Sequence, residues 1–482
     1  MTFVSLTFVA FLFIVFTLYW SFPNRTAQNV VLIVASYVFY GWWDYRYLTL
    51  IIISSLVDYS AGRSLERVVS RRARRAVLLV SVCTNLGLLG IFKYFNFFAE
   101  SFAELVALFG WRASPFMLNV VLPVGISFYT FQTMSYTIDI YNGRLRGRRN
   151  LIDYLAYVAF FPQLVAGPIE RAGSLLVQME RPHTFVYDDA VNGCRQILWG
   201  YFKKIVIADR AAVFVDQCYG HIGTTTGPQF WAATVAFAVQ IYCDFSGYSD
   251  IAIGTASLFG FHLRRNFAYP YFSQSVTEFW RRWHMSLSSW FRDYVYIPLG
   301  GNRVPLSRQL GNVLLTFALC GLWHGASWNF ILWGALHGVY LCAERLWMRP
   351  RALGPDDPPG GPRFVPKASA LLAMGRTFFL VLVAWVFFRA QNLGEACSIL
   401  TKMATEIWHS SAYEGFGTFI KGDYLWLLAV FVVIEWLSRA KRHPFMSTRI
   451  PLALRWAAYT FVIWLCLYVC PDKQMTFIYF QF

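Results

Sequence analysis

QLGNVLLTFALCGLWHGASWNFILWGALHGVYLCA, residues 309–343, is the stretch that decides the fold, because it contains no Asp, Glu, Lys or Arg. As one continuous helix of about 1.5 Å per residue it would be about 52 Å long, which exceeds the ~30 Å hydrocarbon core of a bilayer. Glycine and small polar residues weaken the helix between positions 321 and 329, so we expect a break there with His324 at the bend. Non-helical backbone at membrane depth is tolerated only inside protein or beside a water-filled cavity. The stretch therefore predicts two packed membrane segments, with His324 lining a cavity.

His324 is an ionisable group deep in an apolar run. Such a group is expensive to hold in lipid, so it is a functional-site candidate by default. The alternative is a histidine that only hydrogen-bonds a neighbouring helix. For His337, which follows in the same stretch, we prefer that packing role to a catalytic one.

The composition indicates a membrane protein. Of the 482 residues, 57% are apolar and 14% are charged, whereas a soluble protein carries about 25% charged residues. Apolar segments of membrane length recur along the chain, and some of them are interrupted. We therefore expect an all-α polytopic membrane protein, a bundle of about ten to twelve membrane helices with re-entrant segments and a central cavity.

The formal net charge of +16 is concentrated in runs of arginine, at residues 63–75 and 144–149. The positive-inside rule accounts for most of these residues and places both runs in the cytoplasm and the N-terminus outside. A role in binding phosphates is secondary. We expect no nucleic-acid partner, because no reading module accompanies the charge. We also expect no metal, since the cysteines lack the paired spacing of a zinc site, and no permanently bound cofactor.

The chain is expected to form one integrated membrane domain, residues 1–482. A Pro- and Gly-rich linker marks a loop between two membrane blocks, and the absence of a long internal repeat weakens a transporter interpretation. The expected parts are N-terminal spans at 1–150, a catalytic core at 151–345, a cytoplasmic loop at 346–369, and C-terminal spans with an aromatic tail at 370–482.

A second informative segment is SVTEFWRRWHMSLSSWFRDY, residues 275–294. Its aromatic residues recur at helical spacing, and Glu278 and Arg282 form an i,i+4 pair. We expect one basic, amphipathic helix at the cytoplasmic interface, with His284 on its apolar side. Simple anchoring by Trp and Arg is one interpretation of the pattern. The functional interpretation adds that cationic side chains beside a cavity could hold an anionic thioester donor. The binding candidates here are Trp280, Arg281, Arg282 and Trp283.

A third segment, CDFSGYSD at residues 243–250, places Asp244 and Asp250 in an apolar stretch. Carboxylates in a membrane must be paired or neutralised. We expect structural pairing with an arginine of the interface helix at least as much as a catalytic role. The chain has no G-x-S-x-G elbow, P-loop or H-E-x-x-H motif.

Several stretches together resemble the membrane-bound O-acyltransferase (MBOAT) family. The similarity is to its bacterial alginate O-acetyltransferase branch, which is related to the membrane protein of teichoic-acid D-alanylation. The matching stretches are PVGISFYTFQTMSYTID at 123–139, FPQLVAGPIER at 161–171, YCDFSGYSDIAIG at 242–254, NFAYPYFSQSVTEFWRRWHMSLSSWFRDYVYIPLGGNR at 266–303, and GLWHGASWNFILWGALHG at 321–338.

The resemblance implies an acyltransferase with His324 as its catalytic histidine and His284 in an accessory role. It also implies a thioester donor on the cytoplasmic side, either acetyl-coenzyme A or an acyl-carrier protein, and an acceptor on the other side. His324 would take the proton of the attacking hydroxyl as general base. His284, Asn329 and a backbone N–H are the candidates to hold the oxyanion, and the sequence does not choose among them.

The chain ends in an aromatic run, FIYFQF, whose one phenol belongs to Tyr479. An apolar tail is unfavourable in water, so we expect it either to anchor in the membrane or to dock in the bundle. A docked tail could present Tyr479 as a covalent relay for the acyl group. A similar tail occurs on a small partner in the D-alanylation system that the chain resembles.

The expected function is O-acetylation of an exported polysaccharide such as alginate, by an enzyme of the bacterial inner membrane. Because the chain shows no soluble domain that grips a polymer, we expect extracytoplasmic acetyltransferase proteins as partners. One alternative is acyl transfer to another acceptor: cellulose, peptidoglycan, or teichoic acid from an acyl-carrier protein. The other alternative is a transporter.

Overall fold

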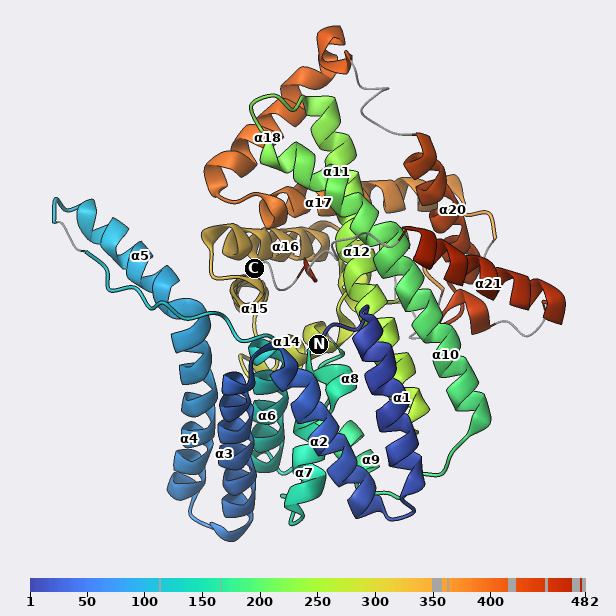
Figure 1. The fold of residues 1–482 in the computed structure, drawn as a ribbon. Coiled ribbons are helices and arrows are strands. Elements are labelled where there is room, and N and C mark those ends of the chain that lie inside the picture. The colour runs from blue at the N-terminus through green and yellow to red at the C-terminus, as the bar shows by residue number, and fades with distance from the viewer. Residues whose placement is uncertain are drawn as a thin grey trace. The chain divides into compact units, whose positions relative to one another are not determined.

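The computed structural model describes residues 1–111, 114–165, 167–348, 358–361, 364–414, 422–446, 450–469 and 477–478. Within these ranges every regular element is a helix (Figure 1). The expected all-α class is therefore confirmed. The chain forms two compact units, one made of Met1–Cys194 with Ala252–Arg264 and the other of Arg195–Ile251 with Arg265–Phe482. The part boundaries expected at residues 150, 345 and 369 stay a prediction.

The α-helices of the first unit are short to medium in length. They are α1 (Leu6–Ser21), α2 (Arg25–Asp44), α3 (Leu48–Arg67), α4 (Arg71–Leu89), α5 (Phe95–Ala107), α6 (Ile126–Tyr141), α7 (Leu151–Ala159), α8 (Phe161–Leu164), α9 (Val177–Met179) and most of α10 (Tyr187–Tyr201).

The second unit contains the stretches that the sequence singled out. Its α-helices are α11 (Asp209–Gly220), most of α12 (Gly227–Leu258), α13 (Val276–Arg282), α14 (Met285–Phe291), α15 (Leu306–His324), α16 (Trp328–Trp347), α17 (Ala368–Arg389), α18 (Leu393–Thr405), α20 (Gly422–Ser438) and α21 (Leu452–Val469).

Three helical segments of the described chain are both long and apolar enough to cross a membrane: Arg71–Ala107, which joins α4 and α5, together with α17 and α21. Only 17% of the most apolar window of Arg71–Ala107 is buried, so most of its apolar side chains face outward, as lipid contact requires. The other helices are shorter or less apolar, and the expected ten to twelve spans stay a prediction.

Polar contacts join three helices of the first unit around Asp58 of α3, which is fully buried. Its carboxylate accepts hydrogen bonds from Asn85 of α4 at 2.7 Å, from Thr137 of α6 at 2.9 Å, and from Ser81 of α4. Lipid is as apolar as a leucine side chain, so hydrogen bonds and close packing hold such helices together.

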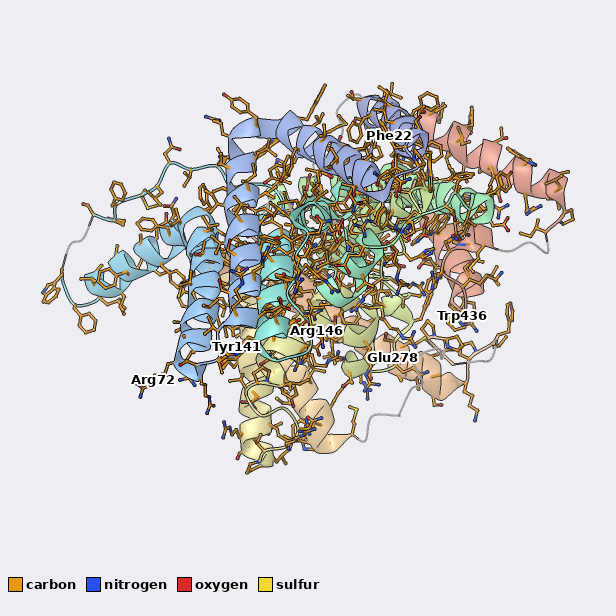
Figure 2. The ribbon with its side chains drawn as sticks, turned by 90° about the horizontal axis from the view of Figure 1, so that it is seen from below. Phe22, Arg72, Tyr141, Arg146, Glu278 and Trp436 are labelled. Carbon is orange, nitrogen blue, oxygen red and sulfur yellow. The ribbon has the colours of Figure 1, made fainter. Side chains whose placement is uncertain are left out.

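The two arginine runs lie at the same end of the first unit (Figure 2). The Arg74 guanidinium donates to the carbonyl oxygens of Leu65 at 2.5 Å and Tyr141 at 3.1 Å. The Tyr59 hydroxyl donates to the carbonyl oxygen of Arg149 at 2.5 Å. These contacts place the runs beside one another, and the side of the membrane that they face stays a prediction.

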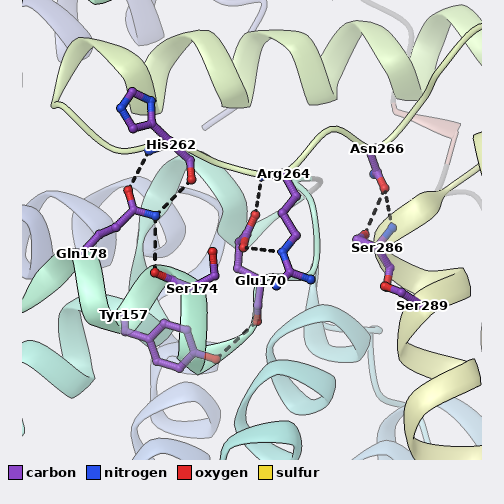
Figure 3. A network of polar contacts seen from close by, with 9 residues as sticks. All are labelled: Tyr157, Glu170, Ser174, Gln178, His262, Arg264, Asn266, Ser286 and Ser289. Atoms are coloured by element: carbon purple, nitrogen blue, oxygen red, sulfur yellow. Dashed lines mark hydrogen bonds and ion pairs between the residues drawn. The ribbon is translucent and has the colours of Figure 1, made fainter. Parts of the chain in front are cut away.

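The chain that follows α12 is also fixed within the first unit. The backbone N–H of His262 donates to the Gln178 side chain at 2.8 Å, and that of Arg264 donates to the buried Glu170 carboxylate at 2.6 Å (Figure 3). These two hydrogen bonds therefore hold the backbone of residues 262–264 in place within the first unit.

In the second unit, α15 and α16 form a hairpin whose backbones touch at glycines. A Cβ atom added to Gly321 would lie 2.0 Å from the carbonyl oxygen of Phe330, and one added to Gly334 would lie 2.1 Å from that of Phe317. No side chain fits at these distances. Glycine at both positions allows the close helix contact that is typical of membrane bundles.

Candidate functional site

The break expected in residues 309–343 is confirmed. Helix α15 ends at His324, and Gly325 continues in an extended conformation with φ −159°. Ser327 begins α16, where its hydroxyl accepts a hydrogen bond from the backbone N–H of Asn329 at 3.2 Å. This cap satisfies one of the free N–H groups at the start of the new helix, and it fixes the turn that carries His324.

His324 is buried, with 3% of its surface exposed, inside a set of aromatic rings. Its ring centroid lies 5.0 Å from that of Trp323, 5.0 Å from that of Trp333 on α16, and 5.5 Å from that of Phe388 on α17. Aromatic burial disfavours a charged imidazolium. The surroundings therefore suit a neutral histidine that can accept a proton.

The single amphipathic helix expected at residues 275–294 is wrong. The segment forms two short helices, α13 and α14, separated by Trp283 and His284. The backbone of His284 is left-handed, with φ +41°. Residues other than glycine adopt this conformation only when the surrounding structure holds them in it. Helical periodicity in the sequence does not reveal this conformation, which turns His284 into the interior of the unit.

The turn at His284 brings it to His324. The two ring centroids lie 6.3 Å apart, and His284 has no exposed surface. Phe245 of α12 packs edge-on against the His284 ring at 4.6 Å, and Trp323 packs at 5.9 Å. The structure thus joins the two histidines that the sequence proposed, forty residues apart, in one buried site.

His337 has contacts that fit a packing role. Its Nδ1 accepts a hydrogen bond from the indole N–H of Trp280 at 3.2 Å. Its ring also stacks on Phe279 at 6.1 Å and meets the edge of Trp333 at 5.1 Å. Trp280 and His337 therefore join α13 to α16.

The other binding candidates of this segment take different positions. Arg282 is buried and pairs with Glu278 at 2.9 Å, as the i,i+4 spacing predicted. Arg281 is exposed. Trp283 packs between the rings of Phe267 at 5.0 Å and Trp385 at 5.1 Å. Of the two arginines, Arg281 is thus the one that presents its charge at the surface.

Asn329 is buried and bonded to a neighbouring helix end. Its side-chain amide donates to the carbonyl oxygen of Ala390, directly after α17, at 2.8 Å. This contact holds the start of α16 against the end of α17, which carries Phe388. A structural task for Asn329 is therefore visible in the geometry, beside the oxyanion role that the sequence left open.

Asp244 and Asp250 pair with lysines, so the arginine partner expected for them is wrong. Lys204 lies 2.7 Å from Asp244 and 2.8 Å from Asp209, and Lys203 lies 2.6 Å from Asp250. The lysines belong to a π-helical turn, Phe202–Ala208, in an apolar stretch of sequence. Two adjacent lysines in such a stretch are the signal that could have identified the partners.

The sequence left docking and membrane anchoring open for the aromatic run, and the two residues that the structure describes there are docked inside the second unit. The Ile478 backbone N–H donates to Asp244 at 2.7 Å. Phe477 has 1% of its surface exposed and packs on Tyr248 at 4.3 Å and on Phe245 at 5.7 Å. Phe245 also contacts His284 and therefore links Phe477 to the site. Tyr479 lies outside the described residues.

Comparison with known proteins decides the family. The sequence profile of the membrane-bound O-acyltransferase family matches residues 142–356. A probable alginate O-acetylase, AlgI, of Pseudomonas putida is 45% identical over 379 residues, which cover 78% of this chain and 74% of that protein. The chain belongs to the MBOAT family.

Two other relatives show the range of MBOAT proteins that are similar to this one. A peptidoglycan O-acetyltransferase of Helicobacter pylori is 34% identical over 406 residues, which cover 79% of this chain and 74% of that protein. A teichoic acid D-alanyltransferase of Streptococcus thermophilus is 29% identical over 284 residues, 55% of this chain and 68% of that protein. This MBOAT protein is a membrane acyltransferase, as the resemblance implied.

Several residues of this MBOAT site carry no distinguishing signal in the sequence. Trp333 and Phe388, which line His324, read as ordinary apolar residues of membrane helices. Asn266, whose side chain lies 3.1 Å from the His284 ring, begins the fourth stretch of the resemblance. An asparagine before an aromatic run was the available signal, but nothing in the sequence indicates which side chain it meets.

Proposed function

We propose that this enzyme moves an acetyl group from a thioester donor on the cytoplasmic side across the inner membrane, for O-acetylation of an exported polysaccharide such as alginate. The observation that carries the proposal is the buried His324–His284 pair at the break between α15 and α16. The similarity to alginate O-acetylases supports the acetyl group and the polymer.

The chemistry assigned to His324 is general base catalysis. A hydroxyl oxygen bonds to the thioester carbonyl carbon while its proton passes to His324. The tetrahedral intermediate then expels sulfur, which leaves with that proton as a thiol, and the acyl group remains as an ester. Burial supports this role, because a neutral imidazole is the form that can take the proton.

In the proposed transfer, a hydroxyl of the C-terminal aromatic run is the first acceptor of the acetyl group. Tyr479 would accept the acetyl group as a phenyl ester, and a hydroxyl of the acceptor would then attack this ester and release the phenol. Support comes from Phe477 and Ile478, which are buried near Phe245 and Asp244. Membrane anchoring by the tail is the alternative. A Tyr479→Phe enzyme that transfers acetyl groups at the normal rate would rule out the relay.

The topology of transfer belongs to the same proposal. We infer that the arginine end of the first unit faces the cytoplasm, following the positive-inside rule. Acetyl-coenzyme A or an acyl-carrier protein would supply the group there. Extracytoplasmic acetyltransferase proteins would then pass it to the polymer. Peptidoglycan is the second candidate acceptor, because the Helicobacter pylori relative acts on it by name.

Thioester turnover by the purified protein tests the proposal. Acetyl-coenzyme A is the probe, and released thiol is the readout. His324→Ala should lower the rate by about 100-fold or more, the usual contribution of a general base. His409→Ala is the matched control, since this histidine of the same unit is exposed. Equal turnover by the two variants would contradict the role of His324.

The same assay separates the donors. If acetyl-coenzyme A gives no turnover in the wild-type enzyme while an acetylated carrier protein does, the donor is the carrier protein. If neither thioester reacts, the proposed function fails.

A further inference from the structure

We propose that Asn266 fixes the proton of His284 on Nδ1, so that Nε2 is the nitrogen with a lone pair and His284 serves the site as a hydrogen-bond acceptor. Asn266 is thus a positioning residue for the reaction. This inference rests on the proposed function, since it assigns a role within the same site.

The contacts of Asn266 place one side-chain oxygen among three groups. It lies 3.1 Å from His284 Nδ1. It also accepts hydrogen bonds from the Ser286 hydroxyl at 2.9 Å and the Ser286 backbone N–H at 3.3 Å (Figure 3). The amide nitrogen of Asn266 donates to the hydroxyl of Ser249 on α12 at 3.3 Å. Asn266 itself is fully buried.

These contacts determine which Asn266 atom faces the histidine. A backbone N–H can only donate, so the side-chain atom beside the Ser286 N–H must be the oxygen and not the amide nitrogen. An amide oxygen can only accept, so His284 Nδ1 must carry a proton to bond with it. In a neutral imidazole the second nitrogen, Nε2, then has the lone pair.

Asn266 also holds the backbone that places the ring. Its carbonyl oxygen accepts a hydrogen bond from the Met285 backbone N–H at 2.9 Å, directly after the left-handed His284. One residue therefore fixes both the orientation of the ring and its tautomer. The His284 ring also packs against Phe245, Phe267, Trp323 and His324.

His337 provides a contrast within the same unit. There the Trp280 indole N–H donates to Nδ1, so neutral His337 carries its proton on Nε2. The two buried histidines thus have opposite tautomers, each set by its partner: a donor at His337 and an acceptor at His284.

The tautomer decides between two roles for His284. A neutral His284 with its proton on Nδ1 cannot donate from Nε2 to an oxyanion. It can accept a proton or a hydrogen bond from a hydroxyl or from a protonated His324. We therefore assign His284 as a second acceptor beside the base, and the oxyanion donor must be another group.

Two variants of Asn266 test this assignment by the pH dependence of acetyl-coenzyme A turnover. Asn266→Asp keeps an acceptor oxygen but adds a negative charge, which favours the imidazolium form of His284. The acidic limb of the pH profile of this variant should therefore move toward high pH by about one pH unit or more. Turnover should recover at pH values above that limb. Asn266→Ala removes the acceptor, and its turnover should fall at every pH.

The matched control is Asn312→Asp. Asn312 is a buried asparagine of the same unit whose amide donates to the carbonyl oxygen of Leu299 at 3.1 Å, away from both site histidines. Its pH profile should follow the wild type. If Asn266→Asp also follows the wild-type profile, at whatever rate, Asn266 is only structural and the proposal is wrong.

A measurement that does not depend on turnover tests the position of the His284 proton independently of the proposed function. Nitrogen chemical shifts of histidine-labelled protein, with the His284 signals assigned through a His284→Gln variant, report which ring nitrogen is protonated. We expect the proton on Nδ1 in the wild type and a mixture in Asn266→Ala. A proton on Nε2 of wild-type His284 would overturn the inference even if thioester turnover and its dependence on His324 are as proposed.

Discussion

Replacing Gly334 by alanine should separate the two helices that hold His324. The new Cβ atom would lie 2.1 Å from the carbonyl oxygen of Phe317, about 1.3 Å closer than the 3.4 Å at which ordinary contact begins. Because the obstacle is backbone, α15 and α16 must move apart by a distance of this order. Overpacking of this kind costs about 1–3 kcal/mol of stability.

The movement should also reach the reaction. Trp333, the residue before Gly334, packs against His324 at 5.0 Å, so a shift of α16 displaces the wall of the site. A misplacement of about 1 Å can lower a rate by about 100-fold. We therefore expect a turnover loss of that order, measured by thiol release from acetyl-coenzyme A at saturating donor.

Gly311→Ala on α15 is the control, because an added Cβ meets nothing within 4 Å there. It should leave turnover unchanged and stabilise the helix by about 0.5–1 kcal/mol. Thermal unfolding in detergent gives the stability of both variants. A Gly334→Ala protein with wild-type stability and turnover would refute the backbone contact between α15 and α16.

Other contacts lead to three further expectations. Lys204→Met leaves the buried Asp244 without its cation and should lower the free energy of unfolding by about 3–5 kcal/mol. Changing Asp244 to Asn in the same protein should restore part of this stability. Phe477→Ala should release the tail, seen as faster proteolysis there and slower acetyl transfer, whereas Phe461→Ala, on an exposed side chain, should change neither. Thr137→Val removes one donor to the Asp58 carboxylate, so it should destabilise the protein by about 1–3 kcal/mol and lower its unfolding temperature accordingly. An unchanged unfolding temperature would mean that this hydrogen bond contributes no net stability.

The sequence predicted those features that depend on neighbouring residues. The break between α15 and α16 follows from the length of the uncharged stretch and from its glycines. The Glu278–Arg282 pair follows from helical spacing. The role of His324 came from the cost of an ionisable group in lipid, together with the resemblance, and its aromatic surroundings agree with it.

Features that depend on distant residues were missed or predicted wrongly. At the turn, Asn266, eighteen positions earlier, bonds both the His284 ring and the next backbone N–H, that of Met285. The lysine partner of Asp244 lies forty positions earlier, on a π-helical turn. Periodicity reports which face of a helix is apolar, but it does not show where a distant side chain ends that helix or which cation pairs with a carboxylate.

The hydrogen bonds to Asp58 have a consequence for how the protein is made. An aspartate at the centre of a membrane helix costs about 2.5–3.5 kcal/mol on insertion, and α3 is not among the three segments that are apolar enough to span alone. The donors that satisfy its carboxylate belong to α4 and α6, which are synthesised later. Stable insertion of α3 should therefore wait at the translocon until its neighbours arrive, so that the three helices enter the bilayer as one cooperative group.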